Sequence, residues 1–63
     1  MFDIELTNGK EYASCNHCNA ANYETPFNKE ITSIYKIRVG CMAICLCADC
    51  MKKLSEQMEE VIK

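Results

Sequence analysis

The chain has 63 residues, of which 49% are hydrophobic, and a formal net charge of −2. This length allows one domain, residues 1–63, whose folding covers only about 60% of the unfolded surface. The chain is acidic and has no basic stretch of the kind found in general nucleic-acid binders. No apolar run reaches the roughly 18 residues of a membrane span. Residues 1–14 also lack the basic start and apolar run of a secretion signal, so we expect a soluble, cytoplasmic protein.

Residues 2–14 are predicted to form an N-terminal β-hairpin. Phe2, Ile4 and Leu6 alternate with acidic residues, which is the periodicity of a strand with one buried face. Asn8-Gly9 follows, and both residues tolerate the positive φ angles of a two-residue hairpin turn. The return strand has a weaker pattern of alternation.

A second hairpin is predicted after a polar, asparagine-rich loop at residues 15–22. Residues 30–39 are rich in β-branched and aromatic side chains, which favour a strand. Gly40 ends this run and indicates a turn, and residues 42–46 would form the partner strand.

Residues 49–63 are predicted to form a C-terminal helix. Met51, Leu54, Met58 and Val61 or Ile62 recur at steps of three and four, which gives one apolar stripe. We expect this stripe to pack on one face of the sheet. If the sheet is too small to cover it, the stripe becomes a partner surface or a homodimer surface.

Cysteine is the most informative residue type in this chain. Four of the six cysteines form two C-x2-C pairs, Cys15 with Cys18 and Cys47 with Cys50, and this spacing is typical of a tetrahedral zinc site. The sequence therefore predicts one Zn²⁺ per chain, held by these four residues. Iron in a rubredoxin-like site is the alternative metal, but there both pairs lie in loops, whereas here the second pair opens the helix.

These features resemble a treble-clef zinc finger, in which a cysteine pair on a tight turn precedes a β-hairpin and a second pair opens a helix. Residues 46–54, Leu-Cys-Ala-Asp-Cys-Met-Lys-Lys-Leu, look like the second half of such fingers. The chain is similar to short zinc proteins of bacteria and phages and, more distantly, to GATA-type fingers. It departs from the GATA type in its longer spacing between the pairs and in lacking a basic stretch after the helix. The resemblance implies an α+β treble-clef domain with two hairpins.

Three further residues, Cys41, Cys45 and His17, carry side chains that can bind a metal ion. Cys41 and Cys45 are expected to be small buried hydrophobic residues, although they could also exchange into the metal site or pair in a disulfide. His17 lies between Cys15 and Cys18, and we expect it to face solvent rather than to bind the ion.

A site closed by four cysteines, in a chain with one histidine, gives no support for catalysis. We therefore expect a non-enzymatic binding module that acts through a protein partner, for example a small bacterial or phage regulatory protein. One alternative is a nucleic-acid-binding finger that uses Lys29, Lys36 and Arg38. Another is a redox or metal-handling protein that uses Cys41 and Cys45.

Overall fold

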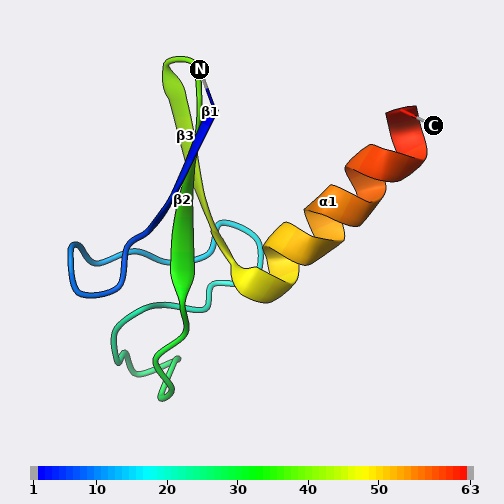
Figure 1. Ribbon diagram of the computed structural model, residues 1–63. Helices are drawn as coiled ribbons and strands as arrows, with labels where there is room; N and C mark the ends of the chain where they lie inside the picture. The colour runs from blue at the N-terminus through cyan, green and yellow to red at the C-terminus, as the bar shows by residue number, and fades with distance from the viewer. Residues whose placement is uncertain (1, 63) are drawn as a thin grey trace.

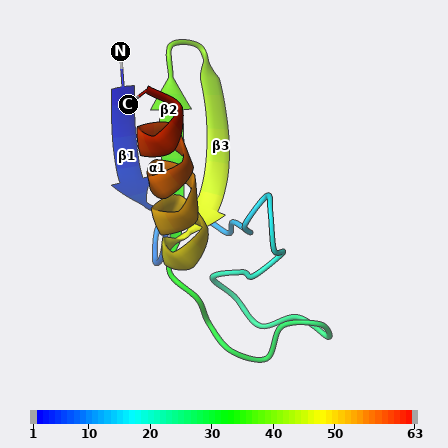
Figure 2. The ribbon, with the colours of Figure 1, turned by 90° about the vertical axis from the view of Figure 1, so that its right-hand side faces the viewer.

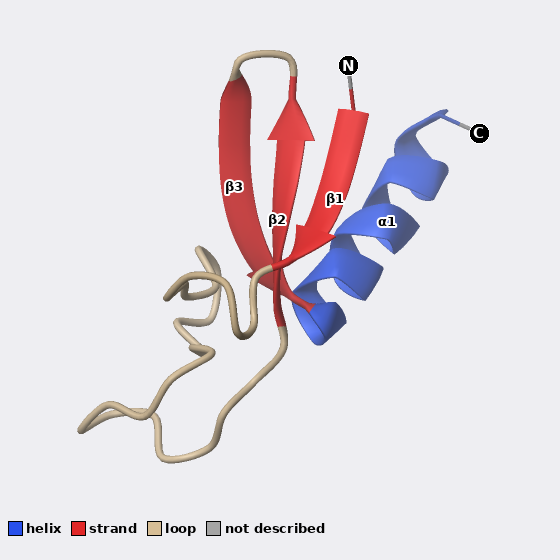
Figure 3. Ribbon diagram, turned by 60° about the vertical axis from the view of Figure 1, so that its left-hand side comes forward, coloured by secondary structure: helices blue, strands red, loops and turns tan. Residues whose placement is uncertain are grey.

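The computed structural model describes residues 2–62, which form three strands followed by one helix (Figure 1). The strands are β1 (Phe2–Leu6), β2 (Ile34–Val39) and β3 (Met42–Cys47), and the helix is α1 (Ala48–Ile62). The strands form one antiparallel sheet in the order β1-β2-β3 (Figure 3). The predicted α+β class is confirmed. Within residues 2–62 no helix has the length and apolar character needed to cross a membrane.

The hairpin predicted around Gly40 is confirmed. Val39 pairs with Met42 across a two-residue turn in which Gly40 has a φ of 62°. Glycine is favoured at this first turn position because other side chains rarely adopt positive φ. In this hairpin, β2 begins at Ile34 rather than at Glu30, so β2 is shorter than the composition of residues 30–39 predicted.

The N-terminal hairpin predicted over residues 2–14 is not formed. Asn8-Gly9 does make a turn, because the Lys10 N–H donates to the Thr7 carbonyl over 2.9 Å and Gly9 has a φ of 82°. The chain then leaves the sheet, and β1 pairs instead with β2. Alternating hydrophobicity fixes which side of a strand is buried, but it does not fix the neighbouring strand.

The register of the three strands places their apolar side chains on one face of the sheet, which we call the apolar sheet face. Its members are Phe2, Ile4, Leu6, Tyr35, Ile37, Val39, Met42, Ile44 and Leu46. Helix α1 lies over this face (Figure 2) and diverges from it towards its C-terminal end (Figure 1). A groove between them is lined by Ile44 and Leu46 of β3 and by Leu54 and Gln57 of α1, and we call this groove the wedge.

Only the first half of the helical stripe packs as predicted. Met51 and Leu54 lie against the core cluster, which includes the buried Leu46. Further along the helix the stripe is exposed: Met58 is 55% exposed, and Val61 in the last turn is 80% exposed. The divergence of α1 from the sheet therefore leaves both walls of the wedge open to solvent.

The opposite face of the sheet is charged at one end and covered at the other. Arg38 on β2 lies 2.7 Å from a Glu5 carboxylate oxygen and 3.8 Å from Asp3, both on β1. At the covered end, Ile34 is fully buried beneath the segment that joins β1 to β2. Burying such a side chain contributes about 1.5–3 kcal/mol to the stability of the fold.

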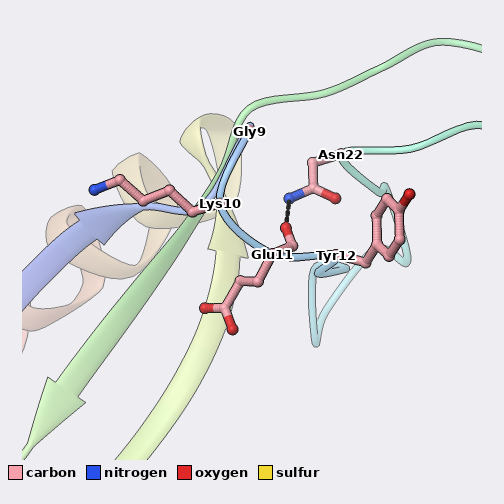
Figure 4. A pocket seen from close by; sticks show the side chains of 5 residues that line it. All are labelled: Gly9, Lys10, Glu11, Tyr12 and Asn22. Carbon is pink, nitrogen blue, oxygen red and sulfur yellow. Dashed lines mark hydrogen bonds between the residues drawn. The ribbon is translucent and has the colours of Figure 1, made fainter.

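Side-chain amides hold this connecting segment, residues 7–33, which contains all five asparagines of the chain. The Asn22 amide donates to the Glu11 carbonyl over 2.8 Å (Figure 4). The side-chain oxygen of Asn22 accepts from the Ala13 N–H over 3.0 Å. Asn28 likewise donates to three backbone carbonyls. These bonds satisfy backbone groups that have no strand partner, which a long irregular segment needs.

Thr7 connects the segment to the sheet. Its side chain is fully buried, its hydroxyl donates to the Ile34 carbonyl over 2.8 Å, and it accepts from the Asn22 amide over 2.8 Å. Its backbone N–H donates to the same Ile34 carbonyl over 2.9 Å. Three bonds therefore meet at the point where the chain leaves β1.

Replacing this hydroxyl should destabilise the protein. Thr7→Val keeps the shape of the side chain but leaves the Asn22 amide short of one acceptor, so we expect a loss of about 1–3 kcal/mol. Denaturant unfolding followed by circular dichroism measures this change. Thr32→Val is the matched control, because the bonds of Thr32 to Ala21 and Asn8 come from its backbone. Equal losses in the two variants would contradict the role given to the Thr7 hydroxyl.

Candidate metal centre

The structure brings all four predicted ligands together. The sulfur atoms of Cys15, Cys18, Cys47 and Cys50 lie within 4.8 Å of one another, and the Cys18 and Cys47 sulfurs are 3.6 Å apart. Sulfurs bound at 2.3 Å around a tetrahedral ion are separated by about 3.8 Å. The cluster therefore has the size of a four-cysteine metal site.

The first pair lies in a tight turn of the segment between β1 and β2. The N–H groups of His17 and Cys18 point at the Cys15 sulfur, at 3.4 and 3.5 Å, and the Asn19 N–H donates to the Cys15 carbonyl over 3.1 Å. Asn19 closes the turn with a φ of 64°, a conformation that asparagine adopts more readily than most residues. The turn thus directs both sulfurs to one side.

Asn16 fastens this turn to the edge of the sheet. Its N–H donates to the Cys45 carbonyl over 2.8 Å, and its side-chain oxygen accepts from the Cys45 N–H over 2.7 Å. Together these bonds resemble one rung of strand pairing on the open edge of β3. They hold the first cysteine pair at a fixed distance from the second.

The second pair spans the junction between strand and helix. Cys47 is the last residue of β3, and Cys50 lies in the first turn of α1. A helix start presents free N–H groups and the positive end of the helix dipole, both of which favour thiolates. The four sulfurs therefore join three parts of the fold, namely the turn, the sheet and the helix.

The protein itself favours ionisation of one thiol and opposes that of two others. Burial raises the pKa of Cys15, but hydrogen bonds from the N–H groups of Cys18, Cys47 and His17 outweigh it and lower the pKa to about 6. The Ala20 N–H lowers the pKa of Cys18, yet the hydrogen bonds shared with the Cys15 and Cys47 thiols raise it overall. The hydrogen bond with the Cys47 thiol, together with burial, raises the pKa of Cys50 well above its usual range.

These pKa directions fit a cation site. One thiolate is stable within the cluster, whereas further thiolates beside it repel one another unless a positive ion lies between them. A divalent ion would supply that charge, and Cys15, Cys18, Cys47 and Cys50 would hold it. The arrangement of soft sulfur donors suits zinc or iron far better than magnesium or calcium.

His17 is not one of the four clustered residues, and its side chain is largely exposed, as predicted. Its ring nevertheless reaches the site, because Nδ1 lies 3.4 Å from the Cys50 sulfur. The sequence reasoning treated His17 as facing solvent only and missed this contact. Its position inside the first C-x2-C pair was the available signal.

The two remaining cysteines lie apart from each other. Cys45 is half-buried beside the core, whereas Cys41 is exposed at the hairpin turn, so the prediction of burial was wrong for Cys41. Four residues of extended strand separate their Cα atoms by about 13 Å. A disulfide needs about 4.4–6.8 Å, so these two residues cannot pair within this fold.

The three predicted nucleic-acid contacts are not presented as a cluster of free cations. Lys36 and Arg38 share one face of β2, but Lys36 lies 3.3 Å from Glu11 and Arg38 pairs with Glu5. Lys29 lies outside the sheet, on the exposed surface of the connecting segment. Carboxylates therefore neutralise the two cations that do lie together.

Comparison of the chain with protein-family models, with curated proteins and with solved structures finds no match. The class of site consequently rests on the four clustered cysteines themselves.

Removing the His17 ring should weaken metal binding. A side chain that hydrogen-bonds a metal ligand orients it, and its loss typically reduces affinity about tenfold to a hundredfold. We expect His17→Ala to show this decrease in a competition titration with a chelator. Asn19→Ala is unsuitable as a control, because Asn19 has a positive φ that alanine rarely adopts. Glu24→Ala serves instead, because Glu24 is an exposed residue of the segment between β1 and β2. Equal affinity of wild type and His17→Ala would contradict an orienting role.

Metal binding should release protons, but fewer than the four ligands could supply. Cys15, with a pKa of about 6, is largely ionised at pH 7, whereas Cys18 and Cys50, with raised pKa values, are neutral. Titration calorimetry in buffers of different ionisation enthalpy measures the number released. The affinity should fall as the pH is lowered, because protons compete for the thiolates. Affinity that is independent of pH would contradict binding through these thiols.

Proposed function

We propose that the protein is a structural zinc module of the treble-clef type that acts through a protein partner. The observation that carries this proposal is the convergence of Cys15, Cys18, Cys47 and Cys50 within 4.8 Å. Zinc is the favoured ion because it takes four thiolates in tetrahedral geometry at structural sites. The order of turn, hairpin and helix supports the treble-clef type, with β1 as an additional strand.

The ion would supply most of the driving force for folding. The buried core consists of Cys15, Ile34, Leu46, Cys47 and Cys50, so three of its five members are proposed ligands. A core of this size contributes little compared with the roughly 10–16 kcal/mol of structural zinc in finger peptides. Folding and metal binding should therefore be one event.

A role in binding rather than catalysis follows from the closed site. Four thiolates occupy all the positions of a tetrahedral ion, so no position is left for a substrate or a water molecule. The chain instead presents exposed apolar side chains on both walls of the wedge, and surfaces of this kind mark contacts with other molecules. The reduced thiols that the site needs fit the cytoplasm.

Native mass spectrometry with and without a chelator, together with circular dichroism, tests the zinc module. We expect one zinc ion per chain and loss of the α1 signal when zinc is removed. Cys50→Ser should lose the ion, whereas the matched control Cys45→Ser should keep it, because Cys45 lies outside the cluster.

Three results would contradict the proposal. A metal-free chain with an unchanged helical signal would show that the ion is not structural, and a mass lowered by pairs of hydrogens would show disulfides instead. Nucleic-acid binding at physiological salt that weakens on neutralising Lys36 and Arg38 would support a nucleic-acid-binding finger in place of a protein-binding module.

A further inference from the structure

Strand β1 forms a free edge of the sheet. β2 pairs with one side of it, and within residues 2–62 no strand pairs with the other side. Figure 2 shows this outer edge facing open space, with α1 in front of the sheet rather than beside β1. An unpaired edge presents a row of backbone N–H and C=O groups to which another strand can bind.

The strand pairing shows which backbone groups of β1 point outwards. The Thr7 N–H donates to the Ile34 carbonyl over 2.9 Å, so Thr7 turns its backbone groups towards the chain of β2. The direction of these groups alternates along an antiparallel strand. The N–H and C=O groups of Leu6 and Ile4, one and three residues before Thr7, therefore point to the outer edge.

The opposite edge of the sheet is better protected than that of β1. On β3 the Cys45 N–H and C=O groups point outwards, and both are bonded to Asn16. No equivalent contact to Ile4 is formed by the residues that the structure describes. β1 also lacks the proline, lysine or bulge with which many proteins block an edge. The edge of β1 is therefore the more accessible of the two.

The side chains of β1 define the strand that would fit beside it. On the apolar sheet face Phe2 is 83%, Ile4 59% and Leu6 42% exposed. An added strand would cover these side chains with apolar side chains of its own. On the opposite face β1 carries Asp3 and Glu5, whose carboxylates remain partly exposed. Basic side chains on the added strand would be favoured opposite these two residues.

The same two carboxylates disfavour a second copy of this chain at the edge. Two β1 strands paired antiparallel about Ile4 would place Asp3 of each copy opposite Glu5 of the other. Like charges directly opposite one another destabilise a strand pair. Arg38 does not remove this repulsion, because it lies 2.7 Å from Glu5 but 3.8 Å from Asp3. The charge pattern therefore selects a different, basic strand.

We propose that the free edge of β1 binds an extended segment of a protein partner by antiparallel strand addition, and that this segment alternates apolar residues with lysine or arginine. This inference rests on the proposed protein-binding function and assigns it a surface and a class of partner. Antiparallel pairing is the more stable arrangement per residue. The backbone bonds would supply affinity, and the alternating side chains would supply specificity.

A seven-residue peptide of alternating valine and lysine, capped at both ends, is the probe. We expect titration calorimetry to show saturable binding of one peptide to the zinc-loaded protein. A peptide of alternating valine and glutamate should bind at least about tenfold more weakly, because its carboxylates would face Asp3 and Glu5. Equal affinity for the two peptides would overturn the proposed chemistry of the partner.

Proline substitution tests the edge itself. Ile4→Pro removes an N–H that points outwards and no bond to β2, so binding should be lost while the zinc content and the circular dichroism are kept. Ala43→Pro is the matched control, because Ala43 lies two residues before Cys45 and turns its N–H to the opposite edge. This control should bind the peptide as the wild type does. Binding lost in Ala43→Pro but kept in Ile4→Pro would place the site on β3 and overturn the proposal.

Methylation of the peptide nitrogens tests the same bonds without changing the protein. In an antiparallel pair the valine residues lie opposite Ile4 and Leu6 and bond to their backbone, whereas the lysine N–H groups point away. Methylating the valine nitrogens should therefore abolish binding, and methylating the lysine nitrogens should not. Unchanged binding of the valine-methylated peptide would overturn antiparallel strand addition.

The failure of this inference is distinct from the failure of the proposed function. A zinc-loaded chain that does not bind the valine–lysine peptide would overturn the role of the β1 edge and leave the zinc module intact. A metal-free chain that binds the peptide in the same way would overturn the zinc module and leave the edge standing. Binding of nucleic acid but not of the peptide would overturn both the protein-binding function and the role of the edge.

Discussion

The fold depends on the convergence of four sulfur atoms at one point. Cys15 comes from the segment between β1 and β2, Cys47 from the end of β3 and Cys50 from the start of α1, and these three also form most of the buried core. The candidate metal centre and the core are therefore the same set of atoms. In a chain that buries few large side chains, the thiols take the place of an interior built from leucine and isoleucine.

The parts of the structure that the sequence predicted well are those fixed by local chemistry. The C-x2-C spacing, the Gly40 turn and the apolar stripe of α1 each involve residues close together in the chain. The pairing of β1 with β2 joins residues such as Phe2 and Val39, and nothing in a local pattern specifies so distant a partner. The Asn8-Gly9 turn does form, but a turn fixes a change of direction and not what the chain does afterwards.

The extent of burial was less predictable than the position of the elements. The stripe of α1 is correctly placed, but its packing depends on the angle between helix and sheet, and no residue pattern encodes that angle. Cys41 illustrates the same limit, because its side chain suits a core, while its place in the hairpin turn exposes it. Among the residues near the site, His17 was expected only to face solvent. Its contact with the Cys50 sulfur depends on the rotation of one ring, which no local pattern specifies.

A small rotation at the junction between β3 and α1 produces a large displacement at the other end of the helix. Cys47 and Cys50 lie on either side of this junction, and the 15-residue helix extends about 22 Å beyond it. A rotation of about 10° at the junction would move the C-terminal end of α1 by about 4 Å, which is close to the diameter of a methyl group. Small changes in the geometry around the sulfurs are thus amplified into large changes in the width of the wedge. The angle at which four thiols hold one ion would set which surfaces the protein can fit.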